Sequence, residues 1–139
     1  MGMLEYLGGR IASAVGGQFS LTDTLDPSGG PAIVEGQLPE QFPVGIGMMP
    51  YQVSEDIVQA EGVEGIQLHY RGSFTEVMDL RDRIFDDLQG LHSISVSDAL
   101  TIEQVYRSSS TSLGFDANLR LNWSDNYYVH HWAPSTHRL

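Results

Sequence analysis

The sequence contains no cysteine and no lysine, and these two absences exclude several kinds of chemistry. Without cysteine the chain forms no disulfide, thiolate metal site or cysteine nucleophile, and its redox compartment stays open. The glycine-containing segments SGGP and AVGGQ lack the lysine that a phosphate-binding loop requires. No stretch approaches the roughly 20 apolar residues of a membrane span, and no basic leader precedes the first apolar run. We therefore expect a soluble protein made in the cytoplasm.

Positive charge is scarce along the whole chain. Its 7 basic residues are all arginine and are opposed by 18 acidic residues, which gives a formal net charge of -11. A surface of that sign repels phosphate groups within a Debye length, about 8 Å at physiological salt. This balance argues against tight DNA binding through phosphate contacts.

The length of 139 residues suits one domain, residues 1–139, with a hydrophobic fraction of 41% that is normal for a folded protein. The periodicity predicts a helix over about Met3–Val15, ended by Gly16 and Gly17. A loop is expected over Gln18–Pro31 because turn-forming residues dominate it. Two short strands, AIVEGQL and VGIGMMP, should follow, separated by Pro39 and Pro43.

The middle and C-terminal parts alternate between an irregular tract and strands. We expect Tyr51–Gly65 to be irregular and to extend away from the body of the protein. The segments GIQLHYRG, TIEQVYR and ANLRLNW alternate with a period of two and predict strands. The serine-rich RSSSTSLG should bend or bulge a strand, and SDN before YYVHHW offers a turn or bulge. The predicted class is α+β, a mostly antiparallel or mixed sheet packed on one main helix and a short N-terminal helix.

The main helix has the clearest signals in the sequence. Ser73 and Glu76 form a capping box, and Gly90 closes the helix. Its apolar stripe should face the core; that stripe consists of Val77, Leu80, Ile84, Leu88 and Leu91, widened by Phe74, Met78 and Phe85.

The acidic residues of this helix, Asp79, Asp82, Asp86 and Asp87, fall opposite that stripe, with Asp79 and Arg83 at helical contact spacing. They are expected to face solvent or a neighbouring molecule. A catalytic pair would instead need two of them in a shielded cleft.

Other candidate sites favour ordinary structural roles. His130 and His131 point to opposite faces of a strand and so do not share one metal ion, and no serine triad is placed in the sequence. No cofactor, metal or catalytic residue is predicted. Met48 and Met49 fit either core filling or an adaptable contact surface. Tyr127, Tyr128 and Trp132 are equally open, because such residues serve both cores and interfaces.

The order of these elements resembles the tail terminator family of siphophages, also called minor capsid or tail completion proteins. The resemblance runs from about Ala32 to Trp132. It rests on the Arg71-Gly72 step into the helix, on IFDDLQGL over Ile84–Leu91, and on GFDANLRL followed by a strand at Asn126–Val129. The complete absence of lysine departs from the family, whose strands usually carry basic residues.

The resemblance implies a non-enzymatic virion protein of the head-proximal tail end. It would form a homo-oligomer, a hexameric ring, that caps the tail tube and joins it to the head connector, so its partners would be the tube and connector proteins. DNA would pass its acidic lumen without specific binding, and no membrane would be involved. The expected lumen or rim face is Asp79, Asp82, Asp86 and Asp87; the expected subunit or tube interface is Met48, Met49, Tyr51, Glu55, Asp56, Glu61, Arg71, Tyr128 and Trp132.

Two alternatives remain open from the sequence. One is a neighbouring head-tail connector component, such as a head completion or stopper protein. The other is a small acidic hydrolase that uses the carboxylates of the main helix.

Overall fold

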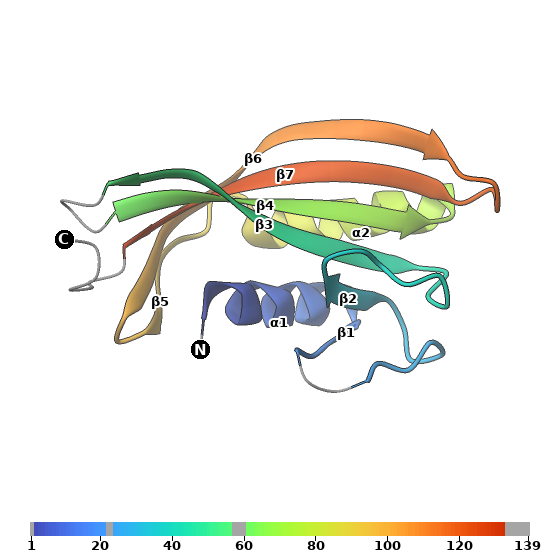
Figure 1. Cartoon of the computed structure of the whole chain (residues 1–139), viewed down its shortest axis with the longest axis horizontal. Helices are drawn as coiled ribbons and strands as arrows, with labels where there is room; N and C mark the ends of the chain where they lie inside the picture. The colour runs from blue at the N-terminus through green and yellow to red at the C-terminus, as the bar shows by residue number, and fades with distance from the viewer. Residues whose placement is uncertain (1, 22–23, 57–60, 133–139) are drawn as a thin grey trace.

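The computed structural model describes residues 2–21, 24–56 and 61–132. Two helices and seven strands are formed in this part of the chain (Figure 1). Their order is α1 (Met3–Val15), β1 (Gln18–Phe19), β2 (Ala32–Glu35), β3 (Gly45–Asp56), β4 (Glu61–Gly72), α2 (Phe74–Leu88), β5 (His92–Ser97), β6 (Leu100–Phe115) and β7 (Leu121–Trp132).

The strands form one mixed sheet in the order β1-β2-β3-β4-β7-β6-β5. The pairs β1–β2 and β2–β3 are parallel, and all other neighbours are antiparallel. The last strand, β7, lies between β4 and β6, so it joins the part of the sheet formed by β1–β4 to the part formed by β5 and β6. The structure confirms the predicted α+β class, although the sheet is more extensive than the sequence pattern indicated.

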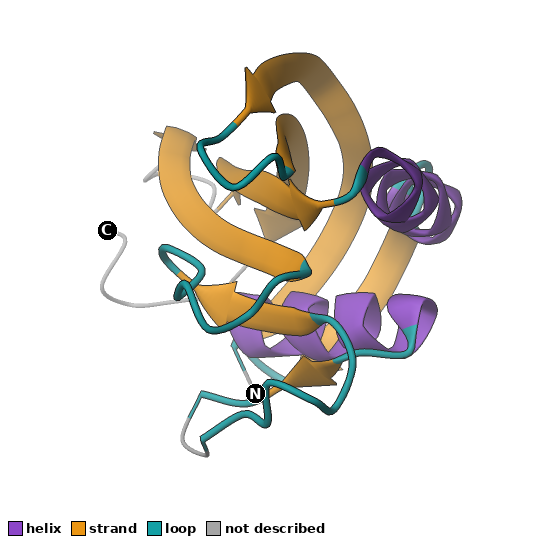
Figure 2. Cartoon of the chain, turned by 90° about the vertical axis from the view of Figure 1, so that its right-hand side faces the viewer, coloured by secondary structure: helices purple, strands orange, loops and turns teal. Residues whose placement is uncertain are grey.

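Both helices lie on one side of the curved sheet (Figure 2). Leu7 and Ile11 of α1 and Ile84 of α2 are buried in the same core as Leu68 of β4 and Val129 of β7. Each of these strands contributes alternate residues to the core, which is the pattern of a sheet covered on one face only. Neither helix of the described residues covers the other face of β3, β4, β7 and β6.

The main helix forms as predicted. The Ser73 backbone N–H donates to Glu76 Oε1 at 2.9 Å, and the Glu76 N–H donates to Ser73 Oγ at 3.2 Å. Gly90, just after the helix, has φ +80°, a conformation that a side chain would strain. Val77, Leu80, Ile84 and Leu88 are buried as expected. Phe74 is the exception, because it is 60% exposed at the first turn instead of widening the core stripe.

The tract Tyr51–Gly65 is not irregular, and this prediction was wrong. Its two halves continue β3 and β4 as an antiparallel pair, with Tyr51 opposite Gly65 and Asp56 opposite Glu61. The Tyr51 ring occupies the space that a side chain at Gly65 would need. Register with the partner strand, which no local pattern shows, decides the conformation here. Residues 57–60 of the tract lie outside the described residues.

Four smaller predictions are corrected or confirmed by the strand pairing. Gln18–Phe19 forms the short strand β1 within the expected loop. Residues 117–120 of the expected strand ANLRLNW form a turn, and β7 begins at Leu121. The SDN segment continues β7 without a break, whereas the serine-rich segment does bulge β6, with register shifts at Arg107/Ser109 and Ser112/Gly114.

Candidate functional site

The outer side of α2 carries the acidic surface that the sequence predicted. Asp79, Asp82 and Asp86 are exposed on the side of the helix away from the core. Asp79 Oδ2 accepts a hydrogen bond from Arg83 Nε at 2.9 Å, with both side chains more than half exposed. An exposed pair of this kind stabilises a helix only slightly. These carboxylates are solvated and not enclosed, so their geometry does not favour the hydrolase alternative.

Asp87 has a different environment from the other three acids. Its Oδ2 accepts a hydrogen bond from Arg10 Nε of α1 at 2.8 Å, and the Asp87 and Arg10 side chains are 27% and 31% exposed. Arg10 also donates to the Tyr6 hydroxyl at 3.0 Å. Partial burial lowers the pKa of Arg10, but the hydrogen bonds to Tyr6 and Asp87 outweigh it and raise the pKa. Asp87 therefore joins the two helices and is not part of a purely solvated face.

An aromatic cluster crosses the face of the sheet opposite the helices. The rings of Tyr106 on β6 and Tyr128 on β7 meet edge to face, with centroids 5.8 Å apart. The Tyr106 ring also stacks on His130 at 5.6 Å. On β3, the Tyr51 hydroxyl donates to Asn126 Oδ1 at 3.3 Å. Aromatic side chains that are partly exposed on an uncovered sheet face are typical of protein interfaces.

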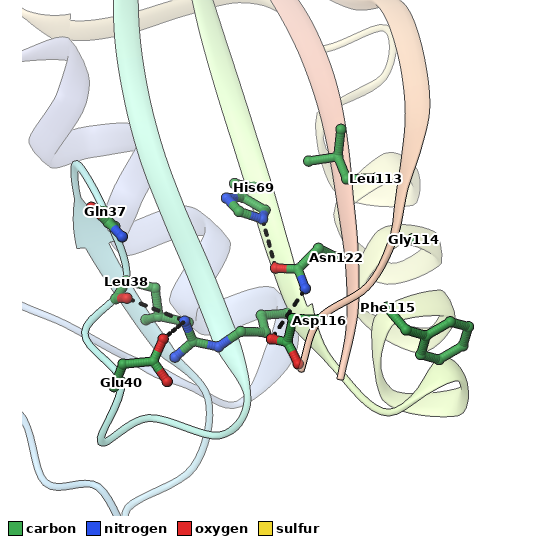
Figure 3. A pocket seen from close by; sticks show the side chains of 10 residues that line it. Gln37, Leu38, Glu40, His69, Leu113, Gly114, Phe115, Asp116 and Asn122 are labelled. Carbon is green, nitrogen blue, oxygen red and sulfur yellow. Dashed lines mark hydrogen bonds and ion pairs between the residues drawn. The ribbon is translucent and has the colours of Figure 1, made fainter. Parts of the chain in front are cut away.

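A hollow of about 390 Å³ lies at one end of this face (Figure 3). Its walls come from the loop after β2, from His69 on β4, and from the ends of β6 and β7. Nε2 of His69 lies 2.9 Å from Oδ1 of Asn122, so the imidazole donates this hydrogen bond. Leu113 and Phe115 point in different directions around the hollow (Figure 3).

Arg71 forms the floor of the hollow and holds the β2–β3 loop in place. Its guanidinium donates to the carbonyl oxygens of Leu38, Pro39 and Phe42, the bond to Pro39 being 2.7 Å long. Burial, together with the charge of Arg120, lowers the pKa of Arg71. The side chain is buried, and its hydrogen bonds to the loop serve the fold. The place of Arg71 at an interface stays a prediction.

The other predicted interface residues differ in how far their side chains are exposed. Met48 is fully buried on the helix side of β3, so it fills the core and is not a contact surface. Its neighbour Met49 points the other way and is exposed, as are Tyr51 and Trp132, while Tyr128 is half-buried in the aromatic cluster. Glu55, Asp56 and Glu61 lie on the paired backbone at the ends of β3 and β4.

A buried ionic network was missed by the sequence analysis. Asp125 of β7 is completely buried and contacts Arg81 Nε of α2 at 3.2 Å. Arg107 lies 3.7 Å from the same carboxylate, and the Ser110 hydroxyl donates to it. Burial and the nearby Asp125 charge raise the pKa of Tyr127. The available signal was an aspartate at a position that alternates with Leu121, Tyr127 and Val129, but the SDN segment was interpreted as a turn or bulge.

The remaining candidates form no metal centre in the structure. His130 and His131 lie on opposite faces of β7, as predicted, with His131 4.0 Å from Glu64. Within residues 2–21, 24–56 and 61–132, no group of three His, Asp or Glu side chains is arranged to hold a metal ion. In that same part of the chain, neither helix has the length and apolar character of a membrane span.

Comparison with known proteins identifies a fold but not a family. No protein family model and no curated protein sequence matches this chain. A chain from a solved structure described as the virion of a native gene transfer agent particle has the same fold, with a TM-score of 0.64. The likeness covers 91% of this chain and 95% of that chain at 10% sequence identity. At that identity the likeness establishes the fold alone.

Proposed function

We propose that this chain is a structural protein of a phage-like particle and that, within it, the chain acts as a tail terminator. In this role it forms a ring, six-membered according to the family resemblance, that stops polymerisation of the tail tube and presents a surface to the head connector. The work of such a protein is assembly and not catalysis.

The shared fold with a chain of a gene transfer agent virion is the observation that carries this proposal. The likeness spans nearly the whole of both chains, so it includes the two helices and the mixed sheet together. A fold does not by itself define a function. Here it agrees with the resemblance over Ala32–Trp132, which was found from the sequence independently of the structure.

The edges of the sheet support head-to-tail association of copies. Only Gly45–Met48 of β3 pair with β2, and only Leu100–Gln104 of β6 pair with β5. In the described part of the chain, no strand pairs with the outer edge of β3 after Met48 or with the outer edge of β6 after Gln104. Two open strand edges on opposite sides of the sheet suit a heterologous contact, in which one edge of a copy meets the other edge of its neighbour. Such contacts close into a ring when the rotation between neighbouring copies allows it.

The distribution of charge supports passage of DNA without binding. The net charge is -11, and α2 presents Asp79, Asp82 and Asp86 to solvent. Carboxylates that line or surround a channel repel the phosphate groups of DNA, so DNA gains no affinity there from the release of its counterions. This is the role we assign to the acidic side of α2.

The far end of the β3–β4 hairpin is the assembly element in this proposal. Glu55, Asp56 and Glu61 place three negative charges on the paired strands at this end. Close packing of this end against another molecule therefore requires a partner whose charge compensates them. Deleting residues 54–61 and closing the strands with a short turn should leave the body folded, because the core residues described on β3 and β4 lie toward the other end of these strands; they are Ile46, Met48, Ile66, Leu68 and Tyr70. The same deletion should prevent completion or joining of tails.

The test is interruption of the gene in the genome that encodes this chain, followed by electron microscopy of the particles. Tails of uncontrolled length are expected for a terminator. Tails of normal length beside separate filled heads would instead indicate the head-tail connector alternative. Normal, infectious or transfer-competent particles would contradict any role in assembly.

A further inference from the structure

The turn between β6 and β7 presents the most exposed large apolar side chain that the structure describes. Leu119 is 81% exposed and has φ +61°, in the left-handed region that side chains other than Gly, Asn and Asp rarely adopt. A leucine there has neither a packing nor a conformational reason to be present. Strain of this kind, held in place by its surroundings, is characteristic of functional positions.

Hydrogen bonds to one carboxylate make this turn rigid. Oδ1 of Asp116 accepts from the backbone N–H of Asn118 at 2.9 Å and from that of Arg120 at 3.1 Å. Its Oδ2 accepts from Arg120 Nε at 3.0 Å and from Asn122 Nδ2 at 3.3 Å. The backbone closes the same turn, since the Leu119 N–H donates to the Asp116 carbonyl at 3.0 Å. The backbone that carries Leu119 is therefore fixed before any partner binds, which lowers the entropic cost of binding.

Two exposed phenylalanines lie at the same end of the molecule. Phe115 is 62% exposed and precedes the turn, and its neighbour across the strands is Leu121. Phe74 is 60% exposed and begins α2, two residues after Gly72, which also pairs with Leu121. Figure 1 shows the start of α2 and the β6–β7 turn together at this end. We call Leu119, Phe115 and Phe74 the apolar end.

We infer that the apolar end is a docking site for a different protein, one with an apolar socket surrounded by basic residues. The charges beside the apolar end decide this choice of partner. Glu76 lies two residues after Phe74, Asp116 anchors the turn, and Glu40 contacts Arg120 at 2.8 Å and Arg71 at 3.8 Å. Glu40 is 74% exposed, whereas the Arg120 and Arg71 side chains are only 16% and 8% exposed, so the charge that faces solvent here is negative. A second copy that met this surface with its own apolar end would bring the same carboxylates, and like charges facing each other across an interface oppose association.

This inference rests on the proposed function in one respect: the partner is expected among the structural proteins of the particle. The experiment replaces Leu119 with the photocrosslinker p-benzoylphenylalanine in the full chain, in producing cells. The expected product is a crosslink to a different protein, at a segment with apolar residues flanked by Lys or Arg. A crosslink only to a second copy, or none at all, would overturn the inference. Because crosslinking is done before particles form, its result is independent of the tail-length phenotype.

A second variant separates docking from folding. Leu119→Asn suits the left-handed conformation, so its thermal midpoint should equal or exceed that of the wild type. Its binding to the crosslinked partner should fall roughly tenfold or more, the size of loss seen when an apolar anchor is truncated. Leu21→Ser, at another exposed leucine, is the matched control and should bind normally. Unchanged binding by Leu119→Asn, or equal losses in both variants, would overturn the inference.

Discussion

Arg81 of α2 and Asp125 of β7 form an ion pair across the helix–sheet boundary, with 3.2 Å between Arg81 Nε and Asp125 Oδ2. Asp125 is fully buried, and the Arg81 side chain is mostly covered. The Arg81 guanidinium also lies over the Trp123 ring, 4.4 Å from its centroid. The pair therefore fixes α2 against the strand that joins the two halves of the sheet. Similarly, Arg107 lies over the ring of Phe85 at 4.3 Å.

Removing the buried carboxylate should destabilise the protein strongly. Asp125→Ala leaves Arg81 and Arg107 without their shared partner, and breaking a buried pair in this way costs about 3–5 kcal/mol. Urea unfolding followed by circular dichroism measures the loss. Asp79→Ala is the control, since its exposed pair with Arg83 should contribute less than about 0.5 kcal/mol. A comparably small loss for Asp125→Ala would show that the network does not hold α2 in place.

The two sides of α2 should respond differently to truncation. Leu80→Ala or Ile84→Ala should lower the free energy of unfolding by about 2–5 kcal/mol, because both side chains are buried in the core. Phe74→Ala removes a mostly exposed ring and should cost less than about 0.5 kcal/mol. If Phe74→Ala were as costly as Ile84→Ala, the phenylalanine would belong to the core and the apolar end would lose one of its members.

The cap of α2 should have an intermediate effect. Ser73→Ala removes the hydroxyl that accepts from the Glu76 N–H, and the loss of such a cap costs about 1 kcal/mol. Chemical denaturation at neutral pH measures it. Ser73→Asp keeps an acceptor at the same position and serves as the matched control, with stability close to that of the wild type.

The contact between the helices should show measurable coupling. In a double-mutant cycle with Arg10→Ala and Asp87→Ala, we expect a coupling energy of about 0.5–1 kcal/mol, because the pair is only partly shielded from solvent. The coupling should decrease at 1 M salt, where screening is stronger. Additive effects of the two substitutions would place Asp87 with the solvated acids, as the sequence alone suggested.

The β6–β7 turn should be sensitive to acid. Partial burial raises the pKa of Asp116, but the hydrogen bonds from the Arg120 and Asn118 backbone and from the Asn122 and Arg120 side chains outweigh it and lower the pKa. A carboxylate with a lowered folded-state pKa contributes stability above its unfolded-state value, about 3.9, and loses that contribution as the pH falls through the folded-state pKa. Asp116→Asn should therefore show a weaker dependence of the thermal midpoint on pH below about 4 than the wild type. Identical profiles would contradict this.

Local signals in the sequence were sufficient for the helices. The Ser73 and Glu76 capping box, the Gly16 and Gly90 stops and the 3.6-residue apolar period all act within a few residues, so the structure confirms α1 and most of α2 as predicted. The strand GIQLHYRG was equally clear, because Ile66, Leu68 and Tyr70 all enter the core from one face.

The candidate site was only partly visible in the sequence. The exposed acids of α2 were predicted, because a helix with one apolar stripe leaves its other side to solvent. The burial of Arg71 was not predicted, since alternation places a residue on a face of the sheet without showing what covers that face. For Arg71 the β2–β3 loop supplies the cover, with three carbonyl oxygens from residues distant in sequence.

The acidic charge, the α+β class and the capped amphipathic helix follow from composition and short-range periodicity, which act within a few residues. The antiparallel pairing of Tyr51–Asp56 with Glu61–Gly65, the burial of Asp125 against Arg81 and the contact of Asp87 with Arg10 follow only from tertiary contacts. Each of these depends on a partner far away in the chain. Strand register and helix docking bring such partners together, and the free energy of those contacts outweighs the weak local preferences of the residues involved.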